Sequence, residues 1–120
     1  MKTDAPTFFS TILQAGVIAH QLHLSATSYA DHKALEKLYE GIPDHTDTLI
    51  ESWQGTNRLI KTYPTPDELP AESPRDFVGG LAGYIEENRA AVGDESQLQN
   101  IVDELAGLVD QTLYRLKYLS

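Results

Sequence analysis

The chain contains no cysteine and has only nine basic residues against eighteen acidic ones. Without cysteine it forms neither a disulfide framework nor a thiolate metal site. The formal net charge of -9 repels phosphate backbones and attracts cations. The N-terminal segment Met1–Pro6 offers a single lysine, and the last residues, Leu119 and Ser120, are not basic. We therefore expect no binding to DNA and a surface that attracts metal ions.

Long apolar runs are also missing. No stretch reaches the roughly 18 apolar residues that a membrane-spanning helix needs, and no signal-peptide pattern opens the chain. We therefore expect a soluble, cytoplasmic protein. A length of 120 residues suits a single domain with a modest core, and we place that domain over residues 1–120.

Proline is concentrated in one segment. Four of the six prolines lie between Tyr63 and Pro74, a composition that favours extended polyproline II structure. Twelve such residues reach about 37 Å at about 3.1 Å per residue, which matches a long helix rather than a hairpin turn. The segment therefore predicts one crossover along the length of a helical bundle.

Apolar residues recur at three- and four-residue spacing on both sides of this segment, which predicts four helices. We expect them over about residues 7–24, 29–61, 74–92 and 94–116. Ser28 is placed to cap the second helix. Pro43 predicts either a kink in that helix or the start of a separate one. The predicted core stripe of the first helix consists of Phe8, Phe9, Ile12, Leu13, Gly16, Val17, His20 and Leu24.

Two histidines and three carboxylates form the candidate functional pattern: His20, His32, Glu36, Asp47 and Glu51. Histidine nitrogen and carboxylate oxygen together suit iron, zinc or manganese. The pairs His32/Glu36 and Asp47/Glu51 fall on one helix face but stand about 22 Å apart at about 1.5 Å per residue. No single metal site spans that distance. The pairs are therefore unrelated, or a second copy of the chain brings one pair opposite the other.

The stretch from His20 to Glu51 resembles the iron site of the Dps-type miniferritins. Their pattern is a histidine, a second histidine twelve residues later, an acid four beyond it, and then an acid pair four apart; here it reads His20, His32, Glu36, Asp47 and Glu51. Weaker similarity continues through the segments Tyr63-Pro64, Asn100-Ile-Val102 and Leu113-Tyr-Arg-Leu116.

This resemblance implies an all-α, ferritin-like four-helix bundle with one long crossover between the second and third helices. It also implies iron as cofactor, Fe(II) oxidation by peroxide or dioxygen, and sequestration of the product. His20, His32 and Glu36 would come from one subunit, and Asp47 and Glu51 from its two-fold mate. The partner would thus be a second copy, in a dimer or a dodecameric cage.

Simpler interpretations stand beside each of these. A lone histidine on an apolar face is more often a core residue, and an acid pair four apart is common on helix surfaces. The alternative function is a non-catalytic helical assembly or virion protein with the same fold. His23 and His45 do not match the ligand pattern. Tyr39 and Trp53 are either packing residues or electron relays.

Overall fold

The structure is a computed structural model and describes residues 3–120. Over this range it contains four α-helices, one short 3-10 helix and no strand, which confirms the all-α prediction. The helices are α1 (Ala5–Ser25), α2 (Tyr29–Thr56), α3 (Pro74–Asn88), η1 (Arg89–Val92) and α4 (Ser96–Tyr118). None of the described helices is long and apolar enough to cross a membrane.

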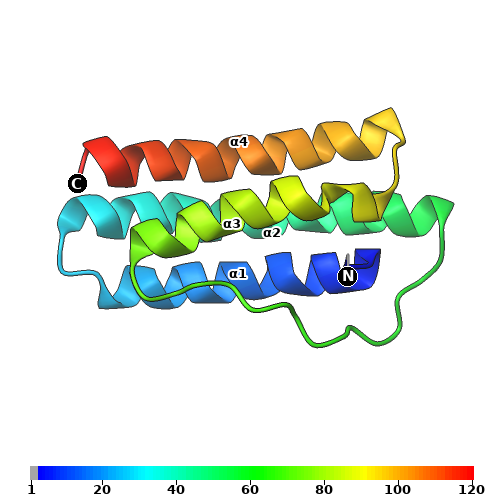
Figure 1. The fold of residues 1–120 in the computed structure, drawn as a ribbon, viewed down its shortest axis with the longest axis horizontal. Coiled ribbons are helices and arrows are strands. Elements are labelled where there is room, and N and C mark those ends of the chain that lie inside the picture. The colour runs from blue at the N-terminus through cyan, green and yellow to red at the C-terminus, as the bar shows by residue number, and fades with distance from the viewer. Residues whose placement is uncertain (1–2) are drawn as a thin grey trace.

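The helices lie along one long axis in a molecule of 42 × 26 × 24 Å (Figure 1). A short turn makes α1 and α2 antiparallel neighbours. The connection after Thr56 then runs back along the bundle, so that α3 points in the same direction as α2, and α4 returns (Figure 1). α2 packs against both α1 and α4, and α3 packs mainly against α4. The segment rich in proline therefore does run the length of the bundle.

Polar side chains cap three of the helices at their N-termini. The side chains of Asp4, Ser28 and Ser73 accept hydrogen bonds from the backbone N–H groups three residues further on, at 3.0, 3.1 and 3.1 Å. Such caps satisfy backbone donors that the first helical turn leaves without a partner. The predicted cap at Ser28 is confirmed.

The end of the second helix differs from the prediction, and the end of the third agrees with it. α2 continues through Pro43 as one helix but ends at Thr56 instead of near Lys61. It ends there because the Asn57 side chain donates to the carbonyl of Trp53 at 2.9 Å, and the Gln54 side chain accepts from a backbone N–H further on. The third helix becomes a 3-10 turn at its end and stops before Gly93, whose φ of 99° suits glycine.

The core stripe predicted for α1 is partly wrong. The buried positions follow the spacing of Phe8, Ile12, Ala15, Ala19 and His23, and all five are less than 6% exposed. The predicted members that lie on the outer face instead, or at its edge, are Leu13, Gly16, Val17, His20 and Leu24. Two of the buried positions are alanines because α2 packs closely against α1. The spacing of large apolar residues alone does not reveal such close packing.

Hydrogen bonds hold the crossover against α1 and α3. Ser10 Oγ donates to the carbonyl of Pro64 at 2.7 Å, and the backbone N–H of Asp67 donates to Thr11 Oγ1 at 2.9 Å. The hydroxyl of Tyr84 on α3 donates to a carboxylate oxygen of Asp67 at 2.7 Å. The crossover is therefore an ordered part of the bundle surface.

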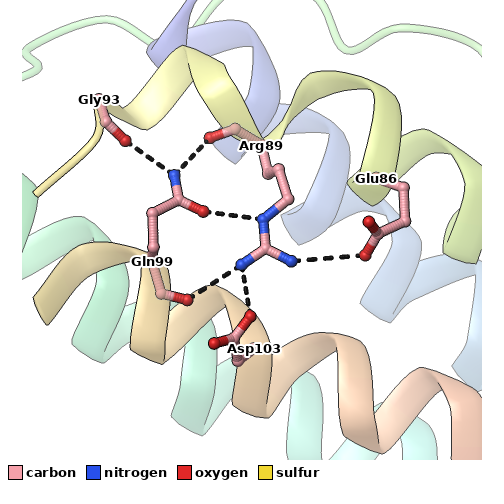
Figure 2. A network of polar contacts seen from close by, with 5 residues as sticks. All are labelled: Glu86, Arg89, Gly93, Gln99 and Asp103. Atoms are coloured by element: carbon pink, nitrogen blue, oxygen red, sulfur yellow. Dashed lines mark hydrogen bonds and ion pairs between the residues drawn. The ribbon is translucent and has the colours of Figure 1, made fainter. Parts of the chain in front are cut away.

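A second polar network joins η1 to α4 (Figure 2). Arg89 donates through Nε to the side-chain oxygen of Gln99 at 2.8 Å, and it also reaches the carboxylates of Asp103 and Glu86. The side-chain amide of Gln99 donates to the carbonyls of Arg89 and Gly93 at 2.9 and 2.7 Å. This exchange closes the turn between the last two helices.

Candidate metal centre

A cluster of possible metal ligands lies where α1 ends and α2 begins. One nitrogen of His23, one nitrogen of His32 and one carboxylate oxygen of Glu36 lie within 4.8 Å of one another. His23 belongs to the last turn of α1, and the other two residues occupy the first two turns of α2. The short turn between the helices, with its Ser28 cap, brings the three side chains together.

The two histidines hydrogen-bond to each other's backbone. His23 Nδ1 lies 2.7 Å from the carbonyl oxygen of His32, and His32 Nδ1 lies 3.0 Å from the carbonyl oxygen of His23. Because a carbonyl oxygen only accepts, both Nδ1 atoms carry the proton. In the neutral rings the lone pair therefore resides on Nε2, which neither of these bonds uses. A metal-binding histidine commonly donates its other ring N–H to a carbonyl in this way.

The rings of His23 and His32 stack with centroids 3.7 Å apart and planes 22° apart. His23 is only 5% exposed, and the centroid of its ring lies 5.1 Å from the centroid of the Tyr39 ring. A metal ion bonds to imidazole nitrogen at about 2.0–2.1 Å in the plane of the ring. Because stacked rings point their lone pairs along nearly parallel lines, both can reach one ion only if the stack opens.

The carboxylate of this cluster already forms an ion pair with a lysine. Lys33 Nζ lies 2.7 Å from Glu36 Oε2, one helical turn away on α2. The hydrogen bond from Lys33 lowers the pKa of Glu36 below its ordinary value, although partial burial opposes this effect. The same bond raises the pKa of Lys33. Glu36 is therefore ionised near neutral pH and needs no deprotonation to bind a cation.

The structure brings together only part of the pattern predicted from the sequence. His32 and Glu36 belong to the cluster, but His20 does not: its exposed ring stacks on Tyr39 with centroids 4.1 Å apart and planes 2° apart. The centroids of His20 and His23 are 6.1 Å apart, so His20 lies next to the cluster without forming part of it.

The acid pair lies elsewhere on the same helix. Asp47 and Glu51 are exposed, and Asp47 follows Glu36 by eleven residues, or about 16 Å at about 1.5 Å per residue. Within one chain they therefore do not join His32 and Glu36. Their role at a site shared between subunits stays a prediction.

Sequence reasoning missed His23. It continues the spacing of the buried residues of α1, in which alanine occupies the two preceding places. Counting small residues as possible core positions would have placed His23 on the buried face and His20 beside it. The fixed spacing of the miniferritin pattern predicted His20 as the ligand instead.

Two further candidates are packed or exposed in ordinary ways. His45 Nδ1 lies 3.8 Å from a carboxylate oxygen of Glu104 at the surface, away from the cluster. Trp53 packs edge-on against Phe9, with ring centroids 5.6 Å apart, and Arg58 lies over its face. These contacts account for both residues without a chemical role.

The fold and the cluster define an all-α protein of four helices with a candidate two-histidine, one-carboxylate metal centre. The chain belongs to a family described as a family of unknown function (DUF5856), whose model matches residues 23–116. It is also similar to a protein of Enterobacteria phage T4, described as an uncharacterized 14.6 kDa protein in the mobD-ri intergenic region. The two are 23% identical over 115 residues, which cover 95% of this chain and 88% of the relative. No solved structure is significantly similar to the chain.

These comparisons correct the resemblance to the Dps-type miniferritins: the family that matches is described as one of unknown function, and neither it nor the phage relative is described as a ferritin. Five residues at fixed spacing carried that resemblance. Histidines and acids on two antiparallel amphipathic helices can take such spacing without common descent. The residues matched by the family model include His23, His32 and Glu36 but not His20.

Proposed function

We propose that the protein binds a divalent transition-metal ion through His23, His32 and Glu36. The observation that carries the proposal is the reciprocal pair of hydrogen bonds, which directs both Nδ1 protons to carbonyls and reserves both Nε2 atoms as ligands. A carboxylate that is ionised near neutral pH lies within reach of both rings. This donor set suits iron, zinc or manganese.

Two nitrogens and one carboxylate leave coordination positions open on the ion. Water or a small oxidant fits such positions, which is why this donor set serves in oxygen-activating iron sites. Oxidation of Fe(II) by peroxide or dioxygen, as predicted from the sequence, would need this openness. That activity rests on the sequence prediction, and metal binding is the part that the contacts described above support.

The test compares metal affinity in four proteins: the wild type and the variants His23→Ala, Glu36→Gln and His20→Ala. Competition with a chromophoric chelator, using Zn²⁺, Mn²⁺ and anaerobic Fe²⁺ in turn, measures affinity. We expect His23→Ala and Glu36→Gln to weaken binding at least tenfold, in the range seen when a ligand or its support is removed, about 10–100-fold. His20→Ala should stay within twofold of the wild type. Equal affinity in all four proteins would overturn the proposal.

We further propose that two copies pair, as predicted from the sequence, and that they do so through the outer face of α1 and α2. Leu13 and Val17, 37% and 48% exposed, line a surface groove together with Pro43. Lys33 and Lys37 precede this groove on α2. An antiparallel mate would set them opposite the acid pair described above, with charges that attract.

The experiment for pairing is the mass in solution together with subunit exchange. A Val17→Asp variant should be monomeric if this face is the interface, and Leu24→Asp, on the same helix but beyond the groove, is its matched control. For the shared site, Asp47→Asn/Glu51→Gln should weaken metal binding in the dimer and leave it unchanged in monomeric Val17→Asp. A wild type that is monomeric at micromolar concentration would contradict both the pairing and the shared metal site.

The order of the helices, with one crossover between the second and the third, is also the order found in ferritin-like bundles. A ferritin-like fold is therefore part of this proposal.

The second candidate function is a non-catalytic helical interaction protein. The end of α1, the start of α2 and the end of α4 lie at the same end of the bundle (Figure 1). Large apolar side chains of these segments are exposed: Leu24, Tyr29, Tyr114, Tyr118 and Leu119. Single exposed apolar residues are normal, but a group of them is typical of surfaces that contact other proteins. Metal titration separates the candidates, because an interaction protein of this kind would show no stoichiometric binding.

A further inference from the structure

Lys33 is the one residue whose side chain makes a direct ionic contact with the proposed ligands in the described range. Its ammonium group donates to Glu36 Oε2 at 2.7 Å, while the side chain remains 43% exposed. The Glu36 side chain is 28% exposed, so the pair is more open to solvent than the buried His23. The Glu36 carboxylate is thus already paired with a cation, the ammonium group of Lys33.

We propose that Lys33 is a displaceable internal cation that competes with the metal for Glu36 and thereby sets the metal affinity of the site. This inference rests on the metal binding proposed above and deepens it. In the metal-free protein the ammonium neutralises Glu36. When a divalent ion binds, Lys33 leaves the carboxylate and moves into solvent, and the histidine stack opens.

Two physical arguments support displacement. An ammonium group on a long flexible side chain loses little when it exchanges an exposed carboxylate for water, because exposed ion pairs contribute little to stability. A cation that stays beside the site repels an incoming divalent ion. At about 5 Å and the dielectric constant of bulk water, that repulsion weakens binding by on the order of tenfold, less at high salt.

The experiment measures Zn²⁺ affinity by chelator competition in full-length Lys33→Gln, Lys33→Arg and the matched control Lys37→Gln. Lys37 lies four residues further along α2 and is exposed, so its replacement changes the net charge equally. We expect Lys33→Gln to bind about tenfold more tightly than the wild type, Lys33→Arg to bind about equally, and Lys37→Gln to change affinity by less than twofold. The carbon-13 signal of the Lys33 Cε should also shift during titration, with an end point of one Zn²⁺ per chain.

The outcomes separate the two proposals. If Lys33→Gln and Lys37→Gln change the affinity equally, or if the Lys33 signal does not move while Zn²⁺ binds, Lys33 is a bystander and metal binding stands. If Zn²⁺ binds to none of the proteins, Lys33→Gln included, the metal centre itself is wrong. Tight binding only in Lys33→Gln would support the competition most directly.

Discussion

His23 and His32 each donate an Nδ1 proton to the backbone carbonyl of the other, at 2.7 and 3.0 Å. This pair of hydrogen bonds links the last turn of α1 to the first turns of α2 and stabilises the fold without a metal. The hydrogen bonds and the proposed metal site both use the two histidine rings, but only the metal site needs Glu36. Stability and metal affinity therefore respond differently to substitutions at these positions.

We expect His23→Ala to lower the free energy of unfolding by about 1–3 kcal/mol in the presence of a chelator, because it empties a buried position and removes a hydrogen bond. Urea denaturation followed by circular dichroism measures this change. Glu36→Gln and His20→Ala are the controls and should stay within about 0.5 kcal/mol, as surface substitutions usually do. A loss of stability in Glu36→Gln equal to that in His23→Ala would argue against separate roles.

Gly80 and Gly83 should respond in opposite ways to alanine. A Cβ atom on Gly80 would lie 2.4 Å from Cγ of Pro70 in the crossover, whereas Gly83 has no such neighbour within 4 Å. Gly80→Ala should destabilise the protein by about 1–2 kcal/mol, because overpacking outweighs the gain in helix propensity. Gly83→Ala should stabilise it by up to about 1 kcal/mol.

Thermal or urea unfolding of both glycine variants checks this pair. Of the three glycines in α3, only Gly80 closely approaches another segment of the chain, and its neighbour there is the ring of Pro70. Stabilisation by Gly80→Ala would contradict this prediction. It would show that the crossover at Pro70 can shift at little cost in free energy, despite the hydrogen bonds that attach the crossover to the bundle.

Tyr84 should make the stability of the protein fall at high pH. Burial of the ring, together with the neighbouring Asp67 carboxylate, raises the pKa of Tyr84 to about 12. The folded state therefore favours the neutral phenol. The resulting stabilisation is fully present below the pKa of an unfolded tyrosine, about 10, and is lost as the pH rises through 12. Because the side chain is only half-buried, we expect a contribution of about 1 kcal/mol.

Denaturant unfolding between pH 8 and pH 12, expressed as the difference between wild type and Tyr84→Phe, isolates this contribution from other titrating groups. The difference should shrink across the upper part of the range. Tyr118→Phe, whose ring is 72% exposed, is the matched control and should give a flat difference. A flat difference for Tyr84→Phe as well would contradict the assignment.

Gln99 should matter more than an ordinary helix glutamine. Its side chain accepts from Arg89 and donates to two carbonyls, so its removal leaves several polar groups of the turn without partners (Figure 2). We expect Gln99→Ala to cost about 1–3 kcal/mol in urea denaturation. Gln111→Ala, at an exposed position of α4, should change the stability by less than about 0.5 kcal/mol.

The amino-acid sequence by itself determined the all-α class, the four helices and the crossover. Apolar spacing indicates which segments bury one face of a helix. Four prolines within residues 63–74 exclude a helix over this segment up to Pro74, which is the first residue of α3. These are local properties, so they need no knowledge of neighbours. The end of α2 escaped prediction because the side chains of Asn57 and Gln54 close it through contacts that no periodicity records.

Only the tertiary structure decided which histidine joins His32 and Glu36. Along α1, His20 and His23 are about one turn apart, and the spacing pattern in the sequence favoured His20 as the ligand. The buried face of α1 contains Ala15, Ala19 and His23, so His23 faces α2, while His20 lies at the surface on Tyr39. The identity of the cluster thus follows from the rotation of one helix against another, which is set by side-chain volume across the interface and not by spacing along one chain.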